Sequence, residues 1–197
     1  NLLVQGGERI ALLGDNGAGK TTLIRCLLDQ EPCDGKIKFG PTIRVGYLPQ
    51  IMHFSHPERS LYDTMLYEKN LTPQAARDRL GAFLFQGEDV FKTVGSLSGG
   101  EQSRLRLCML MDEKINLLIL DEPTSQLDPI AASGFLSTLG RIHRDLGTTV
   151  ILTEHRLDEV IPMADRLLIL DGGRVLADGT PQAVFSTLRE MGHPMRS

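Results

Sequence analysis

Residues 14–22 read GDNGAGKTT, a loop that combines three glycines, one lysine and two threonines. It follows an apolar run and precedes a helical pattern, and its spacing fits the phosphate-loop motif G-x-x-x-x-G-K-[ST]. Glycine is needed where backbone N–H groups wrap closely around phosphate oxygens, and the following helix presents its N-terminus to the same anion. We therefore predict that a nucleotide binds to Gly14, Asp15, Asn16, Gly17, Ala18, Gly19, Lys20, Thr21 and Thr22.

Two side chains at the end of this loop suit the chemistry of a triphosphate. Lys20 is predicted to neutralise charge on the outer phosphates, and the Thr21 hydroxyl is predicted to bind Mg²⁺. The alternative is a glycine-rich turn that contains a lysine by chance. The strand pattern before the loop and the helix pattern after it favour the phosphate-binding interpretation.

A pair of acids supplies the second half of the predicted site. The stretch INLLILDEP brings Asp121 and Glu122 to the end of a buried apolar run, and ligands of open α/β sheets collect at the carboxyl ends of strands. We predict that Asp121 holds Mg²⁺, directly or through water, and that Glu122 orients the attacking water and accepts its proton. The alternative, a solvated acidic pair before a proline turn, is less favoured in a chain that also has a phosphate loop.

A second predicted anion site lies in the segment LSGGEQSR. It places serine and glycine directly before a helical run, so the start of that helix presents backbone donors to an anion. Two such sites in one chain are explained if each ATP lies between the phosphate loop of one subunit and this segment of another. The residues predicted to contact the ATP of the partner subunit are Leu97, Ser98, Gly99, Gly100 and Glu101.

Alternating strands and helices must position these residues. A helix is predicted over 129–146, where apolar residues recur every three or four positions and Gly147 follows. This alternation predicts a doubly wound α/β core with a mainly parallel sheet. Apolar runs bounded by turn or helix signals predict buried strands at 9–14, 115–120, 149–153 and 166–170.

The middle of the chain differs in composition from the rest. Residues 51–111 are predicted to form a mainly helical subdomain that ends with the LSGGE segment, and a helix is expected at 73–85 after the capping residue Thr72. The α/β core then consists of residues 1–50 and 112–197, and the whole chain forms one domain.

Composition narrows the function further. The chain has 197 residues and a net charge of −4 at pH 7, which argues against nucleic-acid binding through bulk positive charge, so no direct DNA binding is expected. Its three cysteines lack metal-ligand spacing and indicate reduced thiols in a cytoplasmic protein. No apolar run approaches the ~20 residues that cross a bilayer. At a membrane, another chain would have to supply the spanning part.

Together these motifs resemble the nucleotide-binding domain of the ATP-binding cassette (ABC) superfamily, and the resemblance covers nearly the whole chain. It implies a phosphate-loop NTPase fold, ATP and Mg²⁺ as cofactors, ATP hydrolysis, and an ATP-dependent head-to-tail dimer with an identical or a different cassette. It assigns Gln50 in VGYLPQ to Mg²⁺ binding and catalysis, and His155 in ILTEH to a catalytic switch. Leu127 and Asp128 in SQLD correspond to the D-loop of the family.

Each of these three motifs also has a simpler interpretation. Gln50 could be a turn residue after a proline, Asp128 could cap the following helix, and His155 could be a surface or capping histidine. Taken singly, each simpler interpretation is favoured. Only the order and number of the motifs support the family assignment of these residues.

The two parts of the chain resemble different branches of the superfamily. Residues 1–124 resemble the soluble, translation-associated ABC-F class, whereas residues 125–197 resemble importer ATPase subunits, especially the energy-coupling-factor type. This combination suggests a natural or constructed hybrid. The first implied function is a transporter motor that binds a membrane-embedded subunit, peripheral at the inner face of the membrane. The alternatives are a ribosome-associated ATPase and a hybrid cassette with weak nucleotide binding and no physiological partner.

The N-terminus departs from the family pattern. Family members usually carry an aromatic residue well upstream of the phosphate loop, which stacks on adenine. None of the thirteen residues before Gly14 is aromatic, and the usual N-terminal antiparallel strand region is expected to be truncated. Because stacking on a base contributes about 1–3 kcal/mol in nucleic-acid sites, we expect weaker ATP binding.

Overall fold

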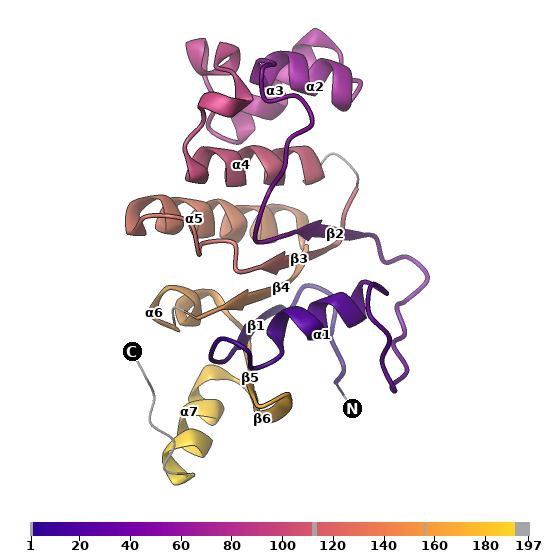
Figure 1. Cartoon of the computed structure of the whole chain (residues 1–197), viewed down its shortest axis with the longest axis vertical. Helices are drawn as coiled ribbons and strands as arrows, with labels where there is room; N and C mark the ends of the chain where they lie inside the picture. The colour runs from indigo at the N-terminus through magenta and orange to yellow at the C-terminus, as the bar shows by residue number, and fades with distance from the viewer. Residues whose placement is uncertain (1, 112–113, 156, 192–197) are drawn as a thin grey trace.

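The structure is a computed structural model that describes residues 2–111, 114–155 and 157–191. Strands and helices alternate along the chain, as Figure 1 shows. The strands are β1 (Arg9–Leu13), β2 (Val45–Leu48), β3 (Leu117–Asp121), β4 (Thr149–Glu154), β5 (Arg166–Asp171) and β6 (Arg174–Gly179). The helices are α1 (Lys20–Leu27), α2 (Leu61–Glu68), α3 (Pro73–Ala82), α4 (Gly99–Leu110), α5 (Pro129–Leu146), α6 (Leu157–Val160) and α7 (Pro181–Glu190), with short 3₁₀ helices at Gly87–Phe91, Val94–Ser96 and Ile161–Met163.

The described strands form one six-stranded sheet in the order β2-β3-β4-β1-β5-β6. All neighbouring pairs are parallel except β5 and β6, which are antiparallel. The four predicted strands are confirmed as β1, β3, β4 and β5, with small differences at their ends. The predicted fold class, a doubly wound and mainly parallel α/β sheet, is therefore confirmed.

Helices cover both faces of the sheet, because the side chains of successive strand residues alternate between the faces. On one face, Ile10 and Leu12 of β1 belong to an apolar cluster with Ile24 of α1. On the other face, Ala11 and Leu13 of β1 belong to a cluster that includes residues of α4, α5 and α7. Helices α1 and α4 therefore lie on opposite sides of the sheet (Figure 1).

Helix α5 has the bounds that the sequence predicted. Asp128 caps its start, because one carboxylate oxygen accepts hydrogen bonds from the amides of Ile130 and Ala131 at 2.9 and 3.0 Å. Pro129 occupies the first position, where no helical partner is needed for its nitrogen. Gly147 ends the helix with a φ of 64°, a left-handed conformation that glycine adopts without penalty.

Helix α3 begins where predicted, but its predicted end is wrong. The pattern indicated a helix over 73–85, whereas α3 ends at Ala82. Leu84 has a left-handed φ of 66°, so the chain folds back on the last turn and the amide of Phe85 donates to the carbonyl of Leu80 at 3.0 Å. Beyond the end of the helix, Phe83 and Phe85 are buried, whereas Leu84 is exposed.

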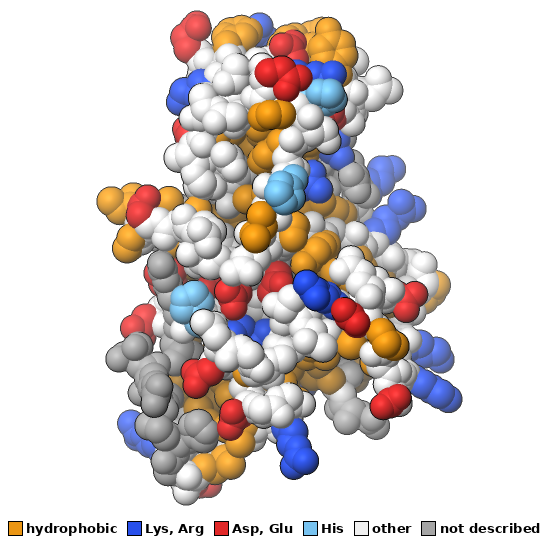
Figure 2. Space-filling view, viewed as in Figure 1, with side chains coloured by type: hydrophobic (Ala, Val, Ile, Leu, Met, Phe, Trp, Pro, Cys, Tyr) orange, Lys and Arg blue, Asp and Glu red, His pale blue; other side chains and the backbone are white. Residues whose placement is uncertain are grey.

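The predicted helical segment, residues 51–111, contains α2, α3 and α4. Helix α4 contacts α5 and β2 as well as α3, so it joins the other helices of the segment to the sheet (Figure 1). Within the described ranges, no helix combines the length and the apolar character needed to cross a bilayer. Figure 2 shows basic and acidic side chains scattered together over one face of the molecule, in keeping with the net charge of −4.

Candidate active site

The carboxyl ends of four neighbouring strands meet at one edge of the sheet. Strand β1 leads into Gly14, β2 ends two residues before Gln50, β3 ends at Asp121, and β4 is followed by His155. This is the edge at which open α/β sheets bind their ligands. The topology thus gathers residues that lie far apart in the sequence.

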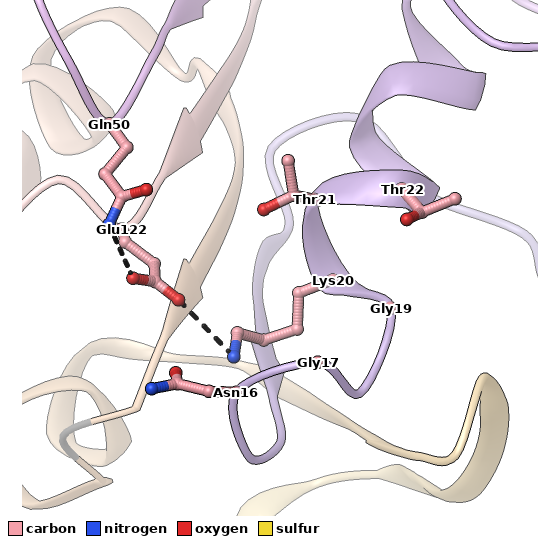
Figure 3. Close-up of a pocket in the computed structure, with 8 residues that line it drawn as sticks. All are labelled: Asn16, Gly17, Gly19, Lys20, Thr21, Thr22, Gln50 and Glu122. Carbon is pink, nitrogen blue, oxygen red and sulfur yellow. Dashed lines mark hydrogen bonds and ion pairs between the residues drawn. The ribbon is translucent and has the colours of Figure 1, made fainter.

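A pocket of about 350 Å³ lies at this edge. It is formed by the loop after β1, the start of α1 and the segments that follow β2 and β3. Figure 3 shows Lys20 and Gln50 pointing toward Glu122 from opposite sides. The lining residues are Asn16, Gly17, Gly19, Lys20, Thr21, Thr22, Gln50 and Glu122.

Glycines shape the phosphate loop for two different reasons. Gly17 and Gly19 have φ values of 83° and 101°, a backbone region that other residues rarely adopt. A Cβ added at Gly14 would lie 2.4 Å from the carbonyl oxygen of Leu170. Gly14 is therefore required by the close packing of the loop against β5, and not only by the approach of a phosphate.

Lys20 is held in the pocket by carbonyl groups of its own loop. Its side chain is 4% exposed, and Nζ donates to the backbone oxygens of Gly14 at 2.7 Å and Asp15 at 3.3 Å. Nζ also lies 3.4 Å from Oε1 of Glu122, whose side chain is 14% exposed. Because both charges are largely removed from water, each needs a charged partner. Lys20 is therefore positioned to exchange the carboxylate for phosphate oxygens.

The oxygen ligands predicted for Mg²⁺ lie next to this ion pair. The Thr21 hydroxyl donates to Oδ1 of the buried Asp121 at 3.2 Å, and Nε2 of Gln50 donates to Oε2 of Glu122 at 3.0 Å. No group of three His, Cys, Asp or Glu side chains in the described part of the chain could hold a metal by itself. A hydroxyl, one carboxylate and an amide fit Mg²⁺, which usually takes few protein ligands and completes its shell with phosphates and water.

Glu122 has a strained backbone that the sequence did not indicate. Its φ is 43°, in the left-handed region that is uncommon for residues other than glycine. Its amide donates to Oγ1 of Thr153 at 2.8 Å, and the same hydroxyl donates to Oδ1 of Asp121 at 2.7 Å. Sequence reasoning missed Thr153 because it looked like an ordinary strand residue.

His155 follows β4 at the correct edge but does not line the pocket. Its side chain is exposed. Of the residues predicted as catalytic, the structure therefore brings Gln50 and Glu122 together and leaves His155 outside the described cavity.

The LSGGE segment forms the start of α4, away from the phosphate loop. Ser98 and Glu101 form a capping box: Oγ of Ser98 accepts from the amide of Glu101 at 3.3 Å, and Oε2 of Glu101 accepts from the amide of Ser98 at 2.9 Å. This backbone hydrogen bond lowers the pKa of Glu101. The capping box uses the amides of Ser98 and Glu101. The amides of Gly99 and Gly100 are therefore the remaining backbone donors of this segment for an anion. Leu97, which precedes the helix, is buried.

The loop after the acid pair packs beside α4. Leu127 is buried, and a Cβ added at Gly99 would lie 3.4 Å from its side chain. Asp128 acts as the helix cap that its simpler interpretation predicted. Within one chain, these two residues therefore pack beside α4 and cap α5. Their predicted role as the D-loop of a dimer stays a prediction.

The sheet order, the loop after β1 and the acid pair at the end of β3 define a phosphate-loop NTPase fold. The chain also matches the family model described as ABC transporter over residues 1–125. It belongs to this family.

Relatives with known names agree with this assignment. A "Putative ABC transporter ATP-binding protein" of Bacillus cereus (strain ATCC 10987 / NRS 248) is 38% identical over 97% of this chain and 38% of its own length. "Zinc import ATP-binding protein ZnuC" of Jannaschia sp. (strain CCS1) is 32% identical over 94% of this chain and 76% of its own length. The chain thus spans well under half of the Bacillus relative.

Solved structures share the fold over almost the whole chain. An inward-facing conformation of a putative metal-chelate type ABC transporter has a TM-score of 0.81 and 26% identity, over 96% of this chain and 80% of the other. The structure of cbiO1 from Clostridium perfringens, described as part of the ABC transporter complex cbiONQ, has a TM-score of 0.74 and 25% identity, over 99% of this chain and 87% of the other.

Proposed function

We propose that the chain binds Mg-ATP in the pocket at the carboxyl edge of the sheet and hydrolyses it as the motor domain of a membrane transporter. One observation carries the proposal: a desolvated lysine of the phosphate loop lies 3.4 Å from a carboxylate in a pocket of about 350 Å³. Phosphate-loop enzymes need a cation for the outer phosphates and a group that orients the attacking water at the same place.

The proposal assigns a task to each of six residues at this edge of the sheet. Lys20 binds the outer phosphates, and the backbone amides of the loop surround them. Thr21, Asp121 and Gln50 would hold Mg²⁺, which would neutralise charge on the phosphate oxygens. Glu122 loses its ion pair with the lysine when phosphates bind, so its carboxylate becomes free to orient water and to accept a proton. His155 is exposed at the same edge and serves as a switch at the outer phosphate.

Two subunits are proposed to share each ATP. Helices α1 and α4 lie on opposite sides of the sheet, so the phosphate loop and the LSGGE segment of one chain are poorly placed to bind one phosphate group together. A head-to-tail pair of chains would place the segment of one subunit over the pocket of the other. Leu127 and Asp128 would then lie near the subunit boundary, because they pack beside the LSGGE segment.

The printed names of the relatives favour transport over translation. They include an importer ATPase and a part of a transporter complex, so we propose a membrane-embedded partner and a location peripheral to the membrane. The Bacillus relative aligns with 97% of this chain, on both sides of Thr124. This alignment supports one lineage for the chain rather than a hybrid with a join at that position.

Lys20→Ala tests the nucleotide site. Hydrogen bonds to charged groups contribute about 1.5–3 kcal/mol, so we expect the variant to bind Mg-ATP about tenfold to a hundredfold more weakly than wild type in isothermal calorimetry. Lys38→Ala is the matched control, because it removes the same charge from an exposed segment that does not line the pocket. Equal affinity in wild type and Lys20→Ala would overturn the proposed site.

A further inference from the structure

The last two residues of β4 are buried polar side chains: Thr153 contacts the acid pair, and Glu154 contacts Thr124, two residues after Glu122. Thr153 and Glu154 are both 0% exposed, because β4 lies in the interior of the sheet, between β3 and β1. Most buried polar side chains have hydrogen-bond partners, because an unpaired one is costly. The partners of these two residues are therefore informative.

Thr153 uses one hydroxyl group to fix two atoms of the site. Its Oγ1 donates to Oδ1 of Asp121 at 2.7 Å and accepts from the amide of Glu122 at 2.8 Å. Oδ1 of Asp121 also accepts from the Thr21 hydroxyl at 3.2 Å. A valine at position 153 would fill the same volume and would lose both hydrogen bonds.

Glu154 holds Thr124, which lies two residues after Glu122 in the chain. Its Oε1 accepts from the amide of Thr124 at 3.0 Å and from the hydroxyl of Thr124 at 2.7 Å. Its Oε2 is buried and has no hydrogen-bond partner in the described chain. A half-satisfied buried carboxyl group is costly to stability, and stability alone does not explain it.

Glu122 belongs to the segment that Thr153 and Glu154 hold, and its backbone has the strained conformation with a φ of 43°. A conformation of this kind is unfavourable and persists only where the surroundings determine it. Here Thr153 accepts a hydrogen bond from the amide of Glu122 itself, and Glu154 accepts one from the amide of Thr124. The constrained backbone directs the carboxylate toward Lys20 and Gln50 in the pocket (Figure 3).

We propose that Thr153 and Glu154 are positioning residues that clamp the segment 122–124 and thereby direct the Glu122 carboxylate into the pocket. The inference rests on the proposed function, because the orientation of this carboxylate matters for ATP hydrolysis. Neither residue contacts the reacting atoms. Both act through the backbone of residues 122–124.

Thr153→Val tests the clamp without changing the shape of the side chain. Without nucleotide, hydrogen exchange measured by NMR should show the amide of Glu122 exchanging about tenfold faster or more, because its acceptor is lost. In the ATPase assay, kcat should fall about tenfold to a hundredfold, the scale that small misplacements cost. KM for Mg-ATP should change less than kcat. Thr153→Ser keeps the hydroxyl and should restore both readouts.

Thr149→Val is the matched control. It makes the same substitution in the same strand, and it removes a hydrogen bond from the Gly7 amide at 2.9 Å, at the end of β4 away from the pocket. Its Glu122 exchange and kcat should equal those of wild type. If Thr153→Val does not fold, Thr124→Val removes the shorter bond to Glu154, leaves β4 intact and should lower kcat about threefold to tenfold.

The outcomes separate the clamp from the proposed function. A wild-type chain without ATPase activity would overturn the proposed function, while the exchange rate of the Glu122 amide would still decide the clamp. Unchanged exchange in Thr153→Val would overturn the clamp. So would an equal loss of kcat in Thr149→Val, or a failure of Thr153→Ser to restore activity.

Discussion

At the residue scale, Glu154 is a buried carboxyl group whose ionisation the fold opposes. Burial raises its pKa above the ordinary value of 4.5, and the hydrogen bonds from Thr124 only partly offset this effect. The folded chain therefore binds this proton more tightly than the unfolded chain. The resulting stabilisation is complete below the ordinary pKa and is lost as pH rises through the raised, folded-state pKa.

Glu154→Gln should remove this pH dependence. The amide is neutral at every pH and keeps a carbonyl oxygen for Thr124, so the variant should gain stability relative to wild type as pH rises from about 4 to about 8. Chemical denaturation at several pH values measures the difference. Glu88→Gln is the control, because Glu88 is exposed and its substitution should shift stability little. A constant difference between Glu154→Gln and wild type across this range would contradict the prediction.

At the element scale, the close approach of α4 and α5 depends on one glycine of the LSGGE segment. A Cβ added at Gly100 would lie 2.9 Å from Cβ of Ala131, and neither atom can rotate away. Overpacking of this kind costs about 1–3 kcal/mol. After a gain in helix propensity of about 1 kcal/mol, Gly100→Ala should therefore lower the free energy of unfolding by up to about 2 kcal/mol. The glycine is explained by packing before any ligand is considered.

Gly99→Ala is the internal control for this prediction, measured by urea denaturation beside Gly100→Ala. It introduces the same side chain one position earlier, where the nearest atom would lie 3.4 Å away, an ordinary contact. It should cost clearly less stability. Equal losses in the two variants would mean that the helix contact does not set the requirement for glycine.

A helix or strand could be predicted where the residues that determine it lie within the element itself. Strands β1, β3, β4 and β5 carry apolar runs, and α5 carries its own cap and stop residues, so their patterns sufficed. Strand β2 is short and begins with the partly exposed Val45, and the edge strand β6 has only one buried residue, so neither strand carries a clear apolar pattern. The end of α3 lies beside Phe85, which is buried in the apolar cluster that includes residues of α4 and α5, a tertiary environment that the local pattern does not reveal.

The same division applies to the site. The loop residues that line the pocket, and Glu122, were predictable because each belongs to a motif that is contiguous in sequence. Thr153 was not, because its task follows from the register in which it lies opposite Asp121. The capping box that occupies part of the LSGGE donors was likewise unforeseen, although Ser98 and Glu101 have the spacing that forms one.

At the scale of the whole molecule, the separation of the two anion-binding helix starts predicts a dimer that depends on ATP. The phosphate loop precedes α1 on one side of the sheet, and the LSGGE segment begins α4 on the other. A nucleotide bound between two chains joins both sites, whereas the chain without nucleotide has no such bridge. The dimer should be most stable when ATP binds but is not consumed.

Glu122→Gln creates this condition, because it keeps the shape of the side chain and removes the carboxylate that accepts a proton from water. It should elute as a monomer without nucleotide and as a dimer with saturating Mg-ATP in size-exclusion chromatography with light scattering. Adding Ser98→Arg should abolish the dimer by placing a bulky side chain at the shared phosphate. Thr180→Arg is the matched control, because Thr180 caps α7 in the same way, so its substitution removes a helix cap and adds the same charge away from both sites. A Glu122→Gln chain that stays monomeric at saturating ATP, or equal effects of the two arginine substitutions, would rule out an ATP shared between two subunits.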